Sequence, residues 1–236
     1  MKHFIFPTLL AAILAGASVS ISAQTNDAVA APAMVPADRA KATLEKHVKP
    51  VLAALNLNDA AKEAKVREIF ATQIPALNAW HAQNDAQLKA LWNEFNKTHS
   101  KTALAKIDDI YATFKTQHDE FNAALAAVLT PEQVETVKDV LTVNKVKVTY
   151  NVYLQIFPAL TDAQKAVVLQ DLKAAREQAI DCEAMPEKSA FFKKYKIKIE
   201  DEYLTAQGYD PKQARKDFAA KQKADAAAKK PANETQ

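Results

Sequence analysis

The sequence predicts an all-α protein, folded as an elongated antiparallel bundle of six or seven helices. Only two glycines occur among its 236 residues, and one of them, Gly16, lies in the apolar N-terminal segment. Alanine, lysine, leucine and glutamine are abundant instead, which is the composition of long helices. The helix-start pattern L-T-x-x-Q occurs at residues 129–133 and again at 160–164. The dearth of glycine also excludes phosphate-cradling loops, dinucleotide fingerprints and the nucleophile elbow of α/β-hydrolases.

Residues 1–23 are typical of a secretory signal peptide. Lys2 precedes an apolar run, and small residues follow it up to Ala23. Cleavage after Ala23 would leave Gln24 as the first residue. Residues 28–30 (AVA) offer a second cleavage site. An uncleaved membrane anchor is the alternative, but the apolar run is short for a bilayer and no basic flank follows it. We therefore expect export to the periplasm or extracellular medium of a bacterium, with no stable membrane insertion after cleavage.

The rest of the chain divides by composition. Residues 24–36 are rich in alanine and proline and are expected to form a flexible spacer. Residues 37–218 form the expected helical domain, and residues 219–236 an Ala/Lys-rich disordered tail. Removing the signal peptide takes away only the charge of Lys2, so the net charge falls from +3 to +2. Because acidic and basic residues are interspersed, nucleic acid is not expected as a partner.

Apolar residues repeat with helical spacing between the breaks in the chain. Helices are expected over residues 37–55, 58–98, 101–128, 130–156, 161–184 and 187–207, with a last one from residue 210. Thr130 and Thr161 suit the N-cap position, and the glutamines three residues further on can complete a capping box. Gly208 fits the left-handed position that ends a helix. Short connections between these segments predict antiparallel neighbours.

Two of these segments carry a competing signal. In 58–98 the apolar stripe continues past Pro75, which can kink the helix. In 130–156 the middle part, residues 143–153, alternates and is rich in β-branched residues, so a strand competes with the helix. The helix is favoured because no partner strand or hairpin turn is evident elsewhere.

Residues that carry enzyme chemistry are few or badly spaced. Cys182 is the only cysteine, so no intramolecular disulfide can form, and no neighbour that would activate its thiol is evident. His118, Asp119 and Glu120 are consecutive, so on a helix they point about 100° apart and cannot easily chelate one ion. Four histidines lie outside the signal peptide, none within an H-E-x-x-H or E-x-x-H motif: His47, His81, His99 and His118. We therefore expect no metal site, no cofactor and no catalytic residue.

One polar and aromatic cluster is a candidate ligand-binding site. It consists of Trp80, His81, Asn84, Asp85 and Trp92. His81 and Asp85 are four residues apart, so imidazole and carboxylate can meet on one helical face. In a functional interpretation, tryptophan stacks on a sugar face or peptide side chain while the polar groups form hydrogen bonds. In a structural interpretation, Trp80 continues the core stripe and the His–Asp pair lies on the surface.

Two resemblances bear on function. The L-T-x-x-Q helix starts resemble those of the exported bacterial chaperones of the Spy and CpxP type. Over residues 37–214 the chain resembles a family of exported proteins with a domain of unknown function, loosely described as sugar-binding and found in polysaccharide-degrading bacteria. This second resemblance is carried by residues 55–59 (LNLND), 77–81 (LNAWH) with Asp85, and 192–196 (FKKYK) leading to 208–210 (GYD). It implies carbohydrate binding and supplies no established catalytic residues.

These observations together predict an exported, non-enzymatic binding protein. Its partner is expected to be an oligosaccharide or another small ligand used in polysaccharide utilisation. The first alternative is a periplasmic Spy/CpxP-like chaperone that binds unfolded polypeptide. The second is an uncharacterised hydrolase, because the two carboxylates of a glycosidase can lie far apart in the chain.

The signal peptide leads to a direct prediction. N-terminal sequencing of the protein secreted by a bacterial host should begin at Gln24, because small residues at 20–23 match the specificity of signal peptidase. The same protein retained in the cytoplasm by deletion of residues 4–14 should keep its N-terminal methionine. Secreted protein that begins at Met1 would contradict the prediction.

Overall fold

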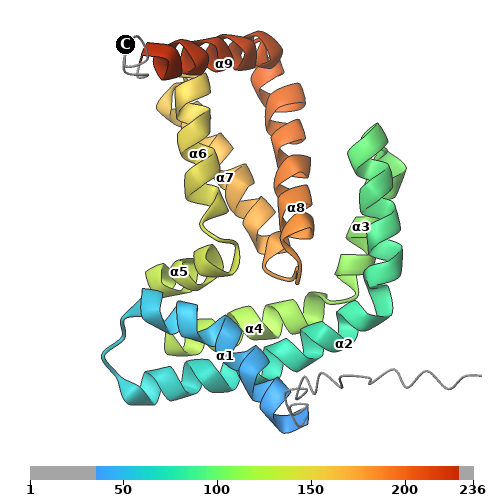
Figure 1. Cartoon of the computed structure of the whole chain (residues 1–236), viewed down its shortest axis with the longest axis vertical. Coiled ribbons are helices and arrows are strands. Elements are labelled where there is room, and N and C mark those ends of the chain that lie inside the picture. Colours follow the sequence, from blue (N-terminus) through green and yellow to red (C-terminus); the bar gives the residue numbers. More distant parts are fainter. Residues whose placement is uncertain (1–35, 229–236) are drawn as a thin grey trace, which may run out of the picture. The chain divides into compact units, whose positions relative to one another are not determined.

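The structure, a computed structural model, describes residues 36–228 (Figure 1). This part of the chain contains nine α-helices, one π-helical segment and no strand, which confirms the all-α prediction. The number of helices is nine rather than six or seven. The elements are α1 (Pro36–Leu55), α2 (Ala60–Thr98), α3 (Lys101–Ala112), α4 (Lys115–Val128), α5 (Pro131–Leu141), α6 (Lys145–Ile156), α7 (Asp162–Ala179), α8 (Met185–Ile197), η1 (Lys198–Leu204) and α9 (Pro211–Ala228).

The helix count is higher because a short turn interrupts each of two expected helices, 101–128 and 130–156. Between α5 and α6, Val143 and Asn144 both adopt left-handed φ angles, of 49° and 56°. Two such residues cannot continue a right-handed helix. Between α3 and α4, the backbone N–H groups of Thr113 and Phe114 bond to carbonyls three residues earlier, which forms a tight turn. Helix α6 covers most of residues 143–153, so the strand alternative for this segment is wrong.

Local capping signals act as the sequence predicts. At the start of α7, Thr161 Oγ1 accepts from the backbone N–H of Gln164 at 3.3 Å, and Gln164 Oε1 accepts from the N–H of Thr161 at 2.9 Å. Helix α5 begins with the same capping box. Gly208 has a φ of +87° and follows the helical turn after η1, as expected for a residue that ends a helix.

Helix α2 connects two hydrophobic clusters. Its 39 residues give it a length of about 58 Å at about 1.5 Å per residue. Val66 and Phe70, in its first half, pack with residues of α1, α4 and α5. Leu88 and Phe95, in its second half, pack with residues of α3, α6, α7, α8 and η1. The middle of α2 therefore lies where the two clusters meet, and it carries the candidate site residues.

Helices α6, α7 and α8 run antiparallel, with α7 in contact with both of its neighbours (Figure 1). Ion pairs join α7 to α5. The guanidinium of Arg176 is 2.6 Å from Glu135 and 2.7 Å from Asp139, and Arg176 is only 1% exposed. A buried cation is tolerated when carboxylates and hydrogen bonds surround it in this way.

The π-helical segment η1 replaces the last part of the predicted helix 187–207. Glu200 in this segment accepts hydrogen bonds from the Tyr153 hydroxyl of α6 and from Arg215 Nε of α9, both at 2.6 Å. A π-helix is rare because it widens the hydrogen-bonding ring. Here it coincides with a carboxylate that holds α6 and α9 together.

Both ends of the described region bear on the predicted boundaries. Helix α9 continues to Ala228, so residues 219–228, the first part of the predicted tail, are helical in the structure. Alanine and lysine favour helix strongly enough to explain this extension. The signal peptide, the spacer up to residue 35 and residues 229–236 lie outside the described residues.

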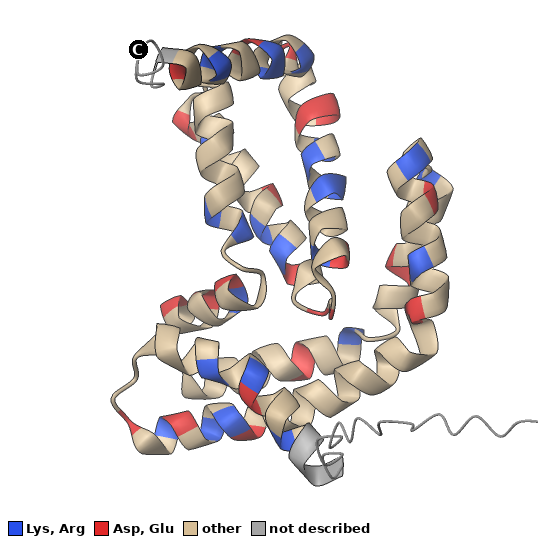
Figure 2. Ribbon diagram, in the orientation of Figure 1, with Lys and Arg blue, Asp and Glu red and all other residues tan. Residues whose placement is uncertain are grey.

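The charges follow the interspersed pattern of the sequence. Lys and Arg alternate with Asp and Glu along most helices (Figure 2). Among residues 36–228, no helix combines the length and the apolar composition needed to cross a membrane.

The capping box of α7 gives a stability prediction. Thr161→Ala should lower the free energy of unfolding by about 1 kcal/mol, because it leaves the Gln164 N–H without its side-chain acceptor. Urea denaturation followed by circular dichroism measures this change. Thr72→Ala is the matched control, since exposed Thr72 lies inside α2 and bonds only to the Glu68 carbonyl of its own helix. Equal effects of the two substitutions would contradict the assignment of Thr161 as a cap.

Candidate functional site

The turn between α7 and α8, residues 180–184, collects polar contacts from several helices; we call it the α7–α8 corner. His81 Nε2 of α2 lies 2.8 Å from the Asp181 backbone carbonyl. His118 Nδ1 of α4 lies 2.7 Å from Asp181 Oδ2. The hydroxyl of Tyr111 in α3 lies 3.3 Å from the sulfur of Cys182. Three helices are therefore joined to one short turn through side-chain contacts.

The imidazole of His81 is fixed from both sides. The residue is 1% exposed, Nε2 contacts the Asp181 carbonyl, and Nδ1 lies 2.6 Å from Asp85 Oδ1. A carbonyl oxygen only accepts hydrogen bonds, so Nε2 carries a proton. Nδ1 is consequently the nitrogen that faces Asp85, either with a second proton or with its lone pair. The predicted pairing of His81 and Asp85 on one helical face is thus present.

His118 forms the second contact with Asp181. The hydrogen bond to Asp181 raises the pKa of His118, although burial acts in the opposite direction. Glu177 Oε2 lies 3.9 Å from His118 Nε2 and adds to this effect. The amide nitrogen Nδ2 of Asn122 is 2.8 Å from the same ring nitrogen and, being a donor, can bond only to an unprotonated Nε2. The positive charge of His118 is therefore stabilised by the carboxylates of Asp181 and Glu177 and not by Asn122.

A pocket of about 360 Å³ is lined by residues of α2 and of the start of α8; we call it the α2–α8 pocket. Most of the side chains around it are polar. They belong to Asp85, Lys89, Trp92, Asn93, Asn96, Ala184, Pro186, Glu187 and Ala190. Its size is within the range of small-molecule sites, about 300–1,000 Å³.

Two buried polar atoms at this pocket lack partners. Trp92 Nε1 and Glu187 Oε2 have no hydrogen-bond partner among the described residues, and Trp92 is only 4% exposed. Burial raises the pKa of Glu187, while the positive charge of a protonated His81 would lower it. A buried donor or acceptor without a partner costs about 1–3 kcal/mol. Two residues of the pocket wall, Trp92 and Glu187, therefore each hold a buried polar atom whose hydrogen-bonding capacity is unused.

The structure places the five predicted site residues in different roles. Asp85 and Trp92 line the α2–α8 pocket, while His81 is buried beside Asp85. Asn84 donates at 2.8 Å to the carbonyl of Trp80 in its own helix. The cluster is therefore not a single ligand surface.

Neither indole ring is arranged as a stacking platform in the way that the functional interpretation expected. Trp80 donates to Thr113 Oγ1 at 2.8 Å, and its ring centroid is 5.0 Å from that of Tyr111 and 5.3 Å from that of Phe114. The ring of Trp92 packs edge-to-face against Phe191 at 4.9 Å. Because aromatic side chains pack against both rings, neither Trp80 nor Trp92 has a free face for stacking.

Sequence reasoning missed Glu187, the residue that completes the pocket. His81, Asp85 and Glu187 each place one ligand-type atom within 4.8 Å of the others. Glu187 lies in the first turn of α8, about a hundred residues after Asp85. Acidic residues are common in the first turn of a helix, because the positive end of the helix dipole stabilises their charge. The sequence around Glu187 therefore gave no sign that it belongs to a site.

Cys182 has the environment of a structural thiol. It is 2% exposed, and burial raises the pKa of its thiol well above the usual value. A thiol with a raised pKa is a poor nucleophile. This agrees with the sequence interpretation of a lone, unactivated cysteine.

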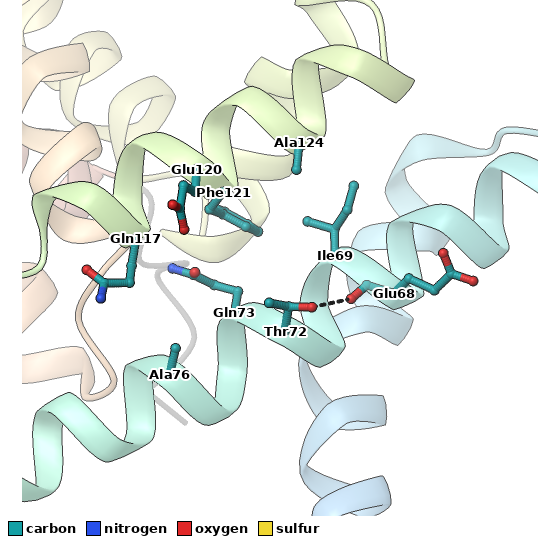
Figure 3. A pocket seen from close by; sticks show the side chains of 9 residues that line it. All are labelled: Glu68, Ile69, Thr72, Gln73, Ala76, Gln117, Glu120, Phe121 and Ala124. Atoms are coloured by element: carbon teal, nitrogen blue, oxygen red, sulfur yellow. Dashed lines mark hydrogen bonds between the residues drawn. The ribbon is translucent and has the colours of Figure 1, made fainter.

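A second pocket, of about 380 Å³, lies between α2 and α4 (Figure 3). Gln73 of α2 and Glu120 of α4 face one another across it, and Ile69 and Phe121 form its apolar wall (Figure 3). None of its side chains contributes a buried polar atom without a partner among the described residues. It therefore shows less unused hydrogen-bonding capacity than the α2–α8 pocket.

Comparison with known proteins identifies a family. A family model described as "Protein of unknown function (DUF3826)" matches residues 41–224. This range contains the α7–α8 corner and every residue of the α2–α8 pocket. No curated protein matches the chain.

The His118–Asp181 contact predicts a pH-dependent stability. Because the folded-state pKa of His118 is raised above its ordinary value of 6.5, the contribution of its charge is lost as the pH rises through the folded-state pKa. Burial also raises the pKa of Asp181, so the contact weakens again in acid, where this carboxylate becomes protonated. His118→Gln should therefore cost about 2 kcal/mol at pH 5.5, the size of a hydrogen bond to a charged group, and less at pH 9.

Urea denaturation of wild type and variant at both pH values measures this difference. His47→Gln is the control, because His47 Nδ1 contacts only a backbone carbonyl, that of Thr43, at 2.8 Å. A cost of His118→Gln that stays constant from pH 5.5 to 9 would show that the charge of His118 is not involved.

Proposed function

The chain belongs to the family described as Protein of unknown function (DUF3826), and we propose that it is an exported, non-enzymatic protein that binds an oligosaccharide in the α2–α8 pocket. The family description assigns no activity, so the proposal is based on the pocket. Its size accommodates one or two sugar rings, and its wall combines apolar surface with the charged and amide side chains of Asp85, Lys89, Asn93, Asn96 and Glu187.

The unused donor and acceptor carry this proposal. Trp92 Nε1 is a hydrogen-bond donor and Glu187 Oε2 is an acceptor. Both atoms are buried, and neither has a partner among the described residues. A sugar hydroxyl both donates and accepts, so the hydroxyls of a carbohydrate can supply an acceptor for Nε1 and a donor for Oε2. An apolar ligand would leave both atoms without a partner and would gain no affinity from them.

The remaining polar groups of the pocket suit the same class of ligand. Asn93 and Asn96 are three residues apart on α2, so they lie side by side on one face of the helix. Both are exposed, so their amides can reach further hydroxyls of the ligand. The backbone carbonyl and side-chain oxygen of Asn96 each accept from Lys193 Nζ at 3.1 Å, which holds the Asn96 amide in place. Such convergent groups fix the orientation of a small ligand.

The distribution of apolar side chains favours a small ligand over unfolded polypeptide. Only three large hydrophobic residues are strongly exposed between residues 40 and 227: Val143, Val148 and Met185. A chaperone that holds unfolded chains needs a broad apolar face. The L-T-x-x-Q motifs have a sufficient explanation in the capping boxes of α5 and α7.

One observation favours a hydrolase as a second candidate. Asp85 and Glu187 place carboxylate oxygens within 4.8 Å of one another at the same pocket. The carboxylates of retaining glycosidases are about 5–5.5 Å apart, and the acid of the pair has a raised pKa, as burial gives Glu187. Release of reducing sugar by the wild type, abolished by Glu187→Gln, would select this alternative over binding.

Two tryptophan variants test the binding proposal. Oligosaccharides are first screened by thermal shift, in which a ligand at a hundred times its Kd stabilises the protein by about 2.7 kcal/mol. Trp92→Phe keeps an aromatic ring but removes Nε1, so the affinity for the identified sugar should fall about tenfold, the value of one hydrogen bond.

Trp80→Phe is the matched control. It also removes an indole N–H, but this group donates to Thr113 outside the pocket, so stability should fall by about 1 kcal/mol while affinity stays unchanged. Isothermal titration of both variants decides the question. Equal loss of affinity in the two variants, or no sugar that stabilises the wild type, would refute the proposed function.

A further inference from the structure

We propose that His81, Asp85 and Glu187 form a binding site for a divalent transition-metal ion, with Zn²⁺ the preferred ion, at the wall of the α2–α8 pocket. The three residues come from the middle of α2 and the first turn of α8. One atom from each, an imidazole nitrogen and two carboxylate oxygens, lies within 4.8 Å of the other two. This inference is independent of whether the pocket binds sugar.

The spacing requires little rearrangement. Zn²⁺ binds nitrogen and oxygen ligands at about 2.0–2.2 Å in a tetrahedron, so neighbouring ligand atoms lie about 3.4 Å apart. Nδ1 of His81 and Oδ1 of Asp85 are 2.6 Å apart, and the Asp85 side chain is 53% exposed. Because an exposed side chain rotates freely, Asp85 can withdraw by the small distance that admits an ion between the two atoms.

The orientation of His81 is that of a metal ligand. Histidines that bind metals nearly always donate their other N–H to a carbonyl or carboxylate, which fixes the ring and its tautomer. His81 Nε2 has this partner in the Asp181 carbonyl at 2.8 Å. The carbonyl is itself held, because the Asp181 side chain contacts His118 at 2.7 Å. Nδ1 is thereby left facing the two carboxylates.

The charge of the cluster matches a dication. Two ionised carboxylates and a neutral imidazole sum to −2, which an M²⁺ ion neutralises. Glu187 Oε2 is buried and has no partner among the described residues, so coordination would supply the interaction that this oxygen lacks. Buried carboxylates are normally paired with a cation or coordinate a metal.

The ligand set selects the class of metal. An imidazole suits zinc, copper, iron and nickel, whereas calcium takes six to eight oxygens and magnesium keeps most of its waters. With three protein ligands, the fourth position of a tetrahedral zinc ion stays open. The neighbouring pocket, with the N–H of Trp92 on its wall, adjoins this position.

Zinc titration of the full chain, produced without a histidine tag and stripped with a chelator, tests the site. Isothermal titration with ZnCl₂ should show one site per chain. Asp85→Asn and Glu187→Gln should each weaken it at least tenfold, because an amide is a much poorer ligand than a carboxylate. MgCl₂ and CaCl₂ at the same concentrations should give no comparable binding.

Glu183→Gln is the matched control. Glu183 lies in the α7–α8 corner, four residues before Glu187. It is exposed and contributes no atom to the cluster. This variant should bind zinc within twofold of wild type. Equal weakening by Glu183→Gln and Glu187→Gln would mean that general negative charge attracts the ion, and would overturn the proposal.

A measurement on the wild type tests the site without depending on whether the variants fold. Nitrogen NMR of the imidazole rings should show one histidine whose Nδ1 resonance shifts on addition of one equivalent of Zn²⁺ while its Nε2 stays protonated. No change in any histidine resonance, or a response of Nε2 instead, would also overturn the proposal.

Discussion

The hydrogen bonds that converge on Asp181 determine how the middle of this protein is assembled. Its carbonyl contacts His81 of α2, and its carboxylate contacts His118 of α4. Burying this carboxylate is unfavourable in isolation, since Asp181 is 6% exposed. His118 offsets part of that cost through its contact with Oδ2, and His81 satisfies the backbone carbonyl, only if both helices pass the corner in the right register. The other carboxylate oxygen, Oδ1, has no partner among the described residues. The contact therefore specifies where α2 and α4 lie against α7 and α8.

The position of the pocket follows from this corner. Once α7 ends at Ala179, the turn carries Asp181 and Cys182 inward, and α8 begins at Met185. Glu187 then lies in the first turn of α8, where a hydrogen bond from the backbone of Ala184 favours its charged form. This arrangement brings a carboxylate from the second half of the chain against Asp85 of α2. A shift of α8 by one residue would turn Glu187 about 100° away.

Local features could be predicted from the sequence, whereas the site could be predicted only in part. The capping boxes at Thr130 and Thr161 and the left-handed Gly208 depend on neighbours within a few residues, and all three were predicted. The His81–Asp85 contact depends on a spacing of four within one helix and was predicted for the same reason. Glu187 was missed because its contact with Asp85 depends on the packing of α8 against α2.

The helix breaks were missed for a different reason. Asn144 adopts a left-handed φ readily, whereas a β-branched residue such as Val143 does so only at an energetic cost. The sequence around them therefore indicates a continuous helix. Tertiary packing outweighs that preference: α5 packs mainly against α1 and α6 against α7, so the chain changes its partner helix between them. The same reasoning applies to Trp92, whose buried N–H costs stability that a better-paired residue would avoid. Local rules of this kind are most often broken at functional sites, which is why the proposed binding of sugar is placed at Trp92.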